Sequence, residues 1–216
     1  MKGLQANSSI QTLQFSRFYH QHKKVHMVKV MPGGVYTSRD PEVICTGLGS
    51  CIAACMWDPQ AHIGGMNHFL LPFSNNAEIE HWHPAEIVST ASRYGNNAME
   101  ILVNQLLAGG AVRERIRLKL FGGAQLMGIS ALIGDKNIEF ALNYAHEENF
   151  EIEAQDLGGI IPRKVMFDPL SGQAWVKRIR FSEVVAKVER SEAKYAKELS
   201  IESYRSHDND AELFNE

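Results

Sequence analysis

The stretch TGLGSCIAACMWDPQAHIGGMNH, residues 46–68, constrains the fold of this chain more than any other. Its glycines loosen the backbone and predict a loop ahead of the apolar run CIAACMW, which is typical of a buried strand. Asp58-Pro59 interrupts this run, because proline fixes its own φ and cannot donate a ladder hydrogen bond. The chain should then return as a second apolar strand over residues 63–71. The stretch therefore predicts a β-hairpin.

The hairpin brings a cysteine and a histidine together. If the turn is centred between Pro59 and Gln60, facing residues have numbers that sum to about 119, so Cys51 lies opposite His68. Directly opposed residues have Cβ atoms ~4.5–5.5 Å apart. An imidazole at that distance can accept the thiol proton, or as imidazolium can lower the thiol pKa. A slip of one residue at the turn would send the two side chains to opposite faces.

Further motifs extend this pattern along the chain. The strings GLGSC and GGMNHFLLP of the hairpin are followed by YGNNAMEILVNQLL at 94–107, KLFGGA at 119–124, IGDKN at 133–137, and DLGG and RKVMF within 156–167. In order and spacing these motifs resemble the CheD family of chemoreceptor glutamine deamidases, over roughly residues 28–180. The set is much more specific than any one of its members.

The resemblance implies a site and a reaction. The family's catalytic cysteine and histidine map onto Cys51 and His68, the pair that the hairpin also selects. A threonine upstream of the cysteine completes the family's site, and Thr46 is the candidate, with Cys45 as the alternative position. The implied reaction is attack of the cysteine thiolate on a glutamine carboxamide, followed by hydrolysis of a thioester. Backbone N–H groups around Ser50 are candidates for binding the oxyanion.

The resemblance also implies the partners. The substrates would be methyl-accepting chemotaxis receptors, with glutamyl methyl esters as a possible second substrate and a CheC-type phosphatase as a possible partner. No cofactor is needed. The net charge of −3 argues against a nucleic-acid binder. No apolar run is long enough to span a membrane and the N-terminus is polar, so a cytoplasmic location without membrane insertion is expected. Three clustered cysteines fit a reducing compartment.

Length and patterning predict three regions in the 216 residues. Residues 1–27 form a flexible arm, residues 28–181 the catalytic domain, and residues 182–216 a charged, solvated helix and disordered tail that chemistry should not need. The family resemblance implies an α+β sandwich of mixed, largely antiparallel sheets with helices packed outside. Beyond the hairpin, we expect strands at 28–31, 35–37, 114–121, 150–154, 164–167 and 174–179, and helices from Pro84 to Gly109 and, after an Asp135 cap, at 136–148.

Two other interpretations stay open. A zinc site would draw on soft or borderline ligands, although the chain has no CxxC motif; the candidates are Cys51, Cys55, His68, His81 and His83. A non-catalytic adaptor would instead keep Cys51 as a small core residue, as free cysteines usually are. Thiol labelling at neutral pH separates these interpretations, because a reactive cysteine is labelled quickly and a core cysteine slowly.

Overall fold

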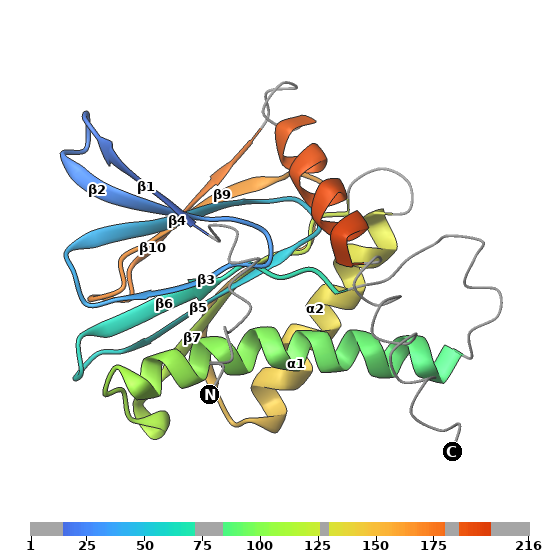
Figure 1. Cartoon of the computed structure of the whole chain (residues 1–216), viewed down its shortest axis with the longest axis horizontal. Helices are drawn as coiled ribbons and strands as arrows, with labels where there is room; N and C mark the ends of the chain where they lie inside the picture. The colour runs from blue at the N-terminus through green and yellow to red at the C-terminus, as the bar shows by residue number, and fades with distance from the viewer. Residues whose placement is uncertain (1–14, 72–83, 126–129, 180–185, 200–216) are drawn as a thin grey trace, which may run out of the picture.

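Two five-stranded sheets and a layer of helices form the protein (Figure 1), a computed structural model that describes residues 15–71, 84–125, 130–179 and 186–199. The first sheet has the order β1-β2-β4-β9-β10. Its β2 and β4 are parallel, and its other pairs are antiparallel. Its strands are β1 (Phe15–His20), β2 (Val25–Val30), β4 (Glu42–Leu48), β9 (Arg163–Phe167) and β10 (Ala174–Arg178).

The second sheet has the order β3-β6-β5-β7-β8, and only β7 and β8 are parallel. The expected mixed and largely antiparallel sandwich is thus confirmed. The strands of this sheet are β3 (Val35–Ser38), β5 (Ile52–Asp58), β6 (Ile63–Asn67), β7 (Arg117–Gly122) and β8 (Glu151–Leu157).

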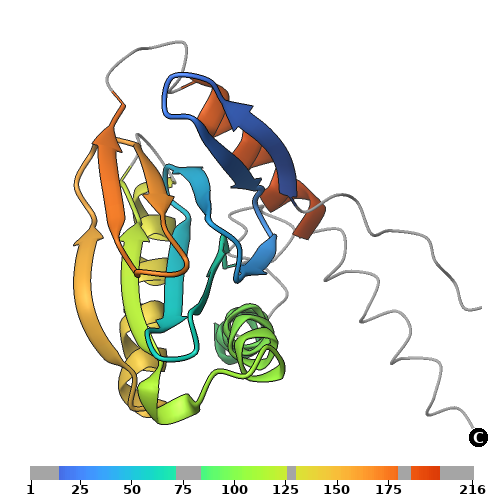
Figure 2. The ribbon, with the colours of Figure 1, turned by 90° about the vertical axis from the view of Figure 1, so that its left-hand side faces the viewer.

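Helices cover the outer face of the second sheet. The helix predicted to begin at Pro84 is α1 (Pro84–Ala108), which Figure 2 shows nearly end-on beside this sheet. A short 3-10 helix, η2 (Arg113–Arg115), precedes β7. The second helix, α2 (Ser130–Glu147), begins before the predicted Asp135 cap, and Asp135 instead accepts a hydrogen bond from Gln125. No helix in the described ranges is both long and apolar enough to cross a lipid bilayer.

Strand β5 is buried on both faces. Alternate residues of a strand point to opposite sides of its sheet. Ala53 and Cys55 face the first sheet, whereas Ile52 and Met56 pack in the cluster under α1 and α2. This two-sided burial explains why the run CIAACMW is continuously apolar rather than alternating.

The hairpin register differs from the prediction by two residues. Cys55 pairs with Met66 and Asp58 with Ile63, so the numbers of facing residues sum to 121 instead of 119. The turn is longer than assumed, because residues 59–62 connect the strands and His62 takes a positive φ of 49°. Since side chains alternate with a period of two, a two-residue shift keeps them on the same face. Cys51 and His68 are therefore diagonal neighbours rather than directly opposed.

Two segments expected to be irregular are strands. Of the predicted arm, residues 1–14 lie outside the described residues, but the segment from residue 15 onward forms β1 and β2. Strand β1 is mostly exposed, and it is ordered by main-chain pairing with β2 rather than by the burial of an apolar face. Its sequence therefore shows no strand pattern. The second segment, β4, includes Thr46 and Gly47 and pairs on both sides, with β2 and β9. Its backbone hydrogen bonds outweigh the low strand propensity of glycine.

The helix over residues 186–199 is not fully solvated. Glu192 and Leu199 are only 5% and 4% exposed. Tyr195 lies directly over Gly33, where a β-carbon would overlap the tyrosine ring. This helix, red in Figure 1, thus packs against the sandwich instead of standing in solvent. The connection between β6 and α1 lies outside the described residues from position 72 to position 83.

Candidate active site

The connection between β4 and β5 presents three backbone N–H groups to one side. Its carbonyl groups are held from the other side by donors of the KLFGGA and IGDKN segments. Gly49 O accepts from Ala124 N at 2.7 Å, Ser50 O from Asn137 Nδ2 at 2.9 Å, and Cys51 O from Gly123 N at 2.8 Å. With the carbonyls fixed, the N–H groups of Gly49, Ser50 and Cys51 form an anion-binding nest.

Gly122 is required for this arrangement. It has a φ of +120°, and an added Cβ would collide with the carbonyl oxygen of Cys51. Only glycine combines that φ with so close an approach of two backbones. The glycine pair of the KLFGGA motif therefore supports the loop that carries the cysteine.

A carboxylate from the C-terminal helix fills the nest. Glu192 Oε1 accepts from Gly49 N at 2.6 Å and from Cys51 N at 3.3 Å. Glu192 Oε2 accepts from Ser50 N at 2.8 Å and from Ser50 Oγ at 2.9 Å. Four donors thus surround one buried carboxylate, which matches an ionised group that can only accept.

Cys51, His68 and Glu192 meet at this point. The cysteine sulfur, a ring nitrogen of His68 and a carboxylate oxygen of Glu192 lie within 4.8 Å of one another, and all three residues are buried. Thr46 Oγ1 lies 2.8 Å from His68 Nδ1 and donates its proton to Val30 O at 2.9 Å. The structure thus brings together all three residues predicted for the site.

The threonine sets the tautomer of the histidine. A hydroxyl has one proton to donate, and that of Thr46 is directed at Val30 O. Thr46 must then accept from His68, so Nδ1 of the imidazole carries the proton. The lone pair is left on Nε2, which is buried and has no hydrogen-bond partner among the described residues. An unprotonated Nε2 is the form that can take a proton from a thiol.

The surroundings hold the pair in its neutral form. Burial raises the pKa of Cys51 well above its usual value, and the negative charge of Glu192 raises it further. Burial also lowers the pKa of His68 to about 3, with a smaller contribution from the positive charge of Lys29. In this state the site holds a thiol and a neutral imidazole, rather than the thiolate and imidazolium considered from the sequence.

His68 should therefore remain neutral where exposed histidines titrate. Its carbon-bound ring proton should keep a constant NMR shift from pH 8 to pH 5, a range that includes the pKa of ~6.5 of a histidine in an unfolded chain. Between pH ~6.5, the pKa of histidine in the unfolded chain, and pH about 3, the unfolded chain binds more protons at His68 than the folded chain does. The free energy of unfolding should therefore fall as the pH falls through this range. Titration of His68 with a midpoint near 6.5 would contradict this.

A metal is the other species that these side chains suggest. A cysteine, a histidine and a carboxylate match the three protein ligands of some catalytic zinc sites. However, both oxygens of Glu192 already accept two hydrogen bonds each from the nest and Ser50. A zinc ligand needs a lone pair directed at the metal. The observed contacts are those of an anion in an amide nest. Of the other zinc candidates, His81 and His83 lie outside the described residues.

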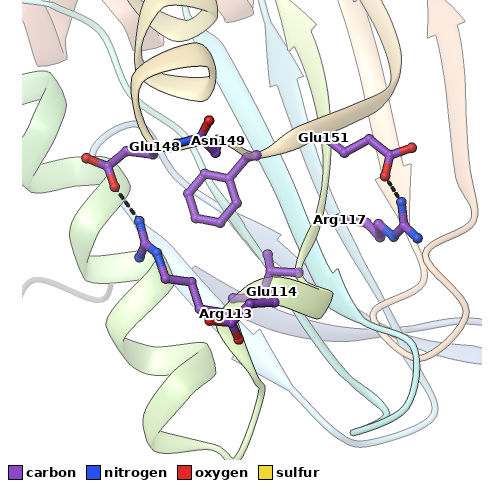
Figure 3. A pocket seen from close by; sticks show the side chains of 8 residues that line it. Arg113, Glu114, Arg117, Glu148, Asn149 and Glu151 are labelled. Atoms are coloured by element: carbon purple, nitrogen blue, oxygen red, sulfur yellow. Dashed lines mark hydrogen bonds and ion pairs between the residues drawn. The ribbon is translucent and has the colours of Figure 1, made fainter.

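Two cavities help to locate the chemistry. A cavity of about 290 Å³ reaches Thr46 and His68, and the C-terminal helix forms one of its walls through Lys187, Val188 and Ser191. A second cavity, of about 400 Å³, lies at the opposite end of β7 (Figure 3). It is lined by charges that pair with one another, Arg113 with Glu148 and Arg117 with Glu151. The described residues around it include no cysteine or histidine. The first cavity, which reaches Thr46 and His68, is therefore the one that lies next to the candidate active site.

The remaining cysteines have other surroundings. Cys45, the alternative to Thr46, is buried and lines the first cavity, but it is Thr46 that accepts the hydrogen bond from His68 Nδ1. Cys55 is fully buried between the sheets, and burial raises its pKa, as expected of a structural cysteine. All three cysteines are free thiols.

Sequence reasoning missed Glu192. Its contacts join residues more than 140 positions apart, beyond the reach of a local motif. One signal was present. Val188, Tyr195 and Leu199 recur at helical spacing and predict an apolar stripe, and an acidic residue in the middle of such a stripe needs donors.

Comparisons with known proteins show the family of this chain. The family model "CheD chemotactic sensory transduction" matches residues 70–178. A protein of Vibrio vulnificus strain CMCP6, named "Probable chemoreceptor glutamine deamidase CheD", is 57% identical over 200 residues, which are 93% of this chain and 92% of that protein. The chain belongs to the CheD family.

More distant members carry the same name. The Vibrio cholerae strain N16961 protein is 55% identical over 93% of this chain and 84% of its own length. That of Hydrogenovibrio crunogenus is 49% identical over 70% of this chain and 76% of its own. The predicted resemblance to the CheD family is thus confirmed over most of the chain.

Proposed function

We propose that this chain is a cysteine-dependent hydrolase that converts glutamine side chains of chemoreceptors to glutamate, the activity for which its relatives are named. The single observation that best supports this is the group formed by Cys51, His68 and the amide nest. A nucleophile, a base with a free nitrogen lone pair and a set of oxyanion donors lie within a few ångströms of one another.

In the proposed reaction, His68 Nε2 takes the thiol proton as the sulfur of Cys51 attacks the carboxamide carbon. The N–H groups of the nest bind the oxygen on which negative charge develops. The imidazolium then protonates the departing ammonia, which leaves a thioester. His68 activates water against the thioester, and glutamate and the free thiol result.

Thr46 is proposed as a positioning residue. By accepting from Nδ1 it fixes the ring and directs Nε2 toward the sulfur. The mechanism uses no cofactor. The proposed substrates are the cytoplasmic parts of methyl-accepting receptors, which places the enzyme in the cytoplasm. Receptor methyl esters are a second proposed substrate, and a CheC-type phosphatase is a proposed partner.

The direct test is the conversion of a receptor fragment. The full chain should convert particular glutamines of a purified cytoplasmic receptor fragment to glutamate, each with a mass gain of about one dalton located by tandem mass spectrometry. The control is the same fragment with those glutamines replaced by alanine. A fragment that keeps all its glutamines after prolonged incubation with excess protein would overturn the proposal.

A further inference from the structure

The helix over residues 186–199 has the features of a bound ligand. It contributes one buried acidic side chain to the site, and that side chain occupies the donors that a reaction at Cys51 would need. Cys51 itself is completely buried beneath this arrangement. A substrate carboxamide cannot reach the sulfur while the Glu192 carboxylate lies in the nest.

We propose that helix 186–199 is a built-in product mimic, in which Glu192 occupies the subsite that takes the substrate's γ-carboxamide and the product's γ-carboxylate, and keeps the enzyme closed until the helix is displaced. The inference rests on the proposed function, because glutamate is the product of glutamine deamidation. It assigns the amides of Gly49, Ser50 and Cys51 as the subsite for that group.

The hydrogen bonds favour a product over a substrate. Both oxygens of Glu192 accept, one from Gly49 and Cys51 and the other from Ser50. A carboxamide would direct its NH₂ at the N–H of Ser50, where two donors would face each other. A carboxylate satisfies every donor. The nest as it stands thus binds the product form more favourably than the amide.

The helix is also held in a way that allows release. The hydroxyl of Tyr195 is buried and has no partner in the described part of the chain. Such a group lowers the stability of the docked helix, since its hydrogen bond to water is lost and not replaced. The site gains on opening as well, because the orphaned Nε2 of His68 would meet solvent or substrate.

Removal of the carboxylate should unmask the cysteine. In the full chain, Glu192→Ala is expected to raise the rate of Cys51 alkylation by iodoacetamide by ~10-fold or more, because burial and the adjacent negative charge both diminish. The matched control is Glu189→Ala, which removes an exposed acidic side chain from the same helix. Tandem mass spectrometry follows Cys51 and Cys55 in the same protein.

Cys55 distinguishes local release from unfolding. It lies fully buried between the sheets and should stay unreactive in all three proteins. The proposal is overturned if Glu192→Ala leaves Cys51 as slow as in the unchanged chain, or if Cys51 and Cys55 become reactive together.

A second variant tests whether residue 192 occupies the substrate subsite. Glu192→Gln places a carboxamide next to Cys51. The sulfur would bond to its carbon, the C–N bond would break with release of ammonia, and water would cleave the thioester to restore glutamate. The helix peptide should gain about one dalton over time, and the double variant Glu192→Gln, Cys51→Ser should not. Persistence of the introduced glutamine, in a protein that does deamidate receptor fragments, would overturn the product-mimic assignment.

The two readouts separate this inference from the proposed function. Alkylation reports whether Glu192 masks Cys51, and receptor deamidation reports the activity. Faster alkylation in Glu192→Ala, with no deamidation by any variant, would reject the activity and leave the masking contact in place. Equal deamidation by the unchanged chain and Glu192→Ala, with equal alkylation, would reject the masking and retain the activity.

Discussion

Replacing Cys51 by serine is expected to lower the rate of receptor deamidation by on the order of 10³-fold or more. The substituted hydroxyl is a far weaker nucleophile, because its pKa is much higher than that of a thiol. The fold should persist, since oxygen replaces sulfur with little change of volume. Conversion of glutamine to glutamate in a receptor fragment, followed by mass spectrometry, measures the effect.

The matched control is Cys55→Ala. Cys55 lies on the same face of β5 but between the sheets, where it contacts core residues rather than the nest. This variant should lose some thermal stability and keep its activity. If Cys51→Ser retains a rate near that of the unchanged chain, or if Cys55→Ala abolishes activity in a folded protein, the nucleophile has been misassigned.

His68→Ala should lower the rate by on the order of 10²–10⁴-fold, the usual contribution of a general acid or base. The variant lacks the imidazole that takes the thiol proton and protonates the departing ammonia. Rates measured from pH 6 to 9 should recover partly at high pH, where the thiolate forms without a base. The control is His62→Ala, an exposed histidine of the β5–β6 turn.

Thr46 provides a finer version of this test. Thr46→Ser keeps the hydroxyl that accepts from Nδ1, whereas Thr46→Val removes it with little change of shape. If the threonine positions the imidazole, valine should lower kcat and change the pH profile, and serine should restore both. Equal kcat values and pH profiles for the two variants would mean that the hydrogen bond to His68 does not matter for the rate.

The sequence was sufficient to predict the sandwich and the pairing of Cys51 with His68, but not the register. Cys51 and His68 come close together whenever both side chains share a face of the hairpin, and a two-residue error in register preserves that. A turn one residue longer or shorter would have separated them. The correct prediction that Cys51 and His68 lie close together therefore depended on whether the turn shifts the register by an even number of residues, as well as on the hairpin itself.

The elements that were missed share a physical cause. The β1 strand is ordered by main-chain pairing with its neighbour β2, and the glycine-containing β4 by pairing with β2 and the distant β9. Such pairing leaves little trace in local composition. Glu192 likewise owes its burial to donors at Gly49, Ser50 and Cys51, far away in sequence. Local periodicity reports which side chains face a core, and it does not report which backbone donors lie opposite them.

The central claim is that deamidation proceeds through a thioester on Cys51, and interception of that thioester by hydroxylamine tests it most directly. Hydroxylamine added during turnover competes with water for an acyl-enzyme, so modified positions of the receptor fragment should carry glutamyl hydroxamate alongside glutamate. The hydroxamate fraction should rise with hydroxylamine concentration and be absent with Cys51→Ser. Turnover that yields only glutamate at every hydroxylamine concentration would contradict the account, because it would mean that water attacks the carboxamide directly.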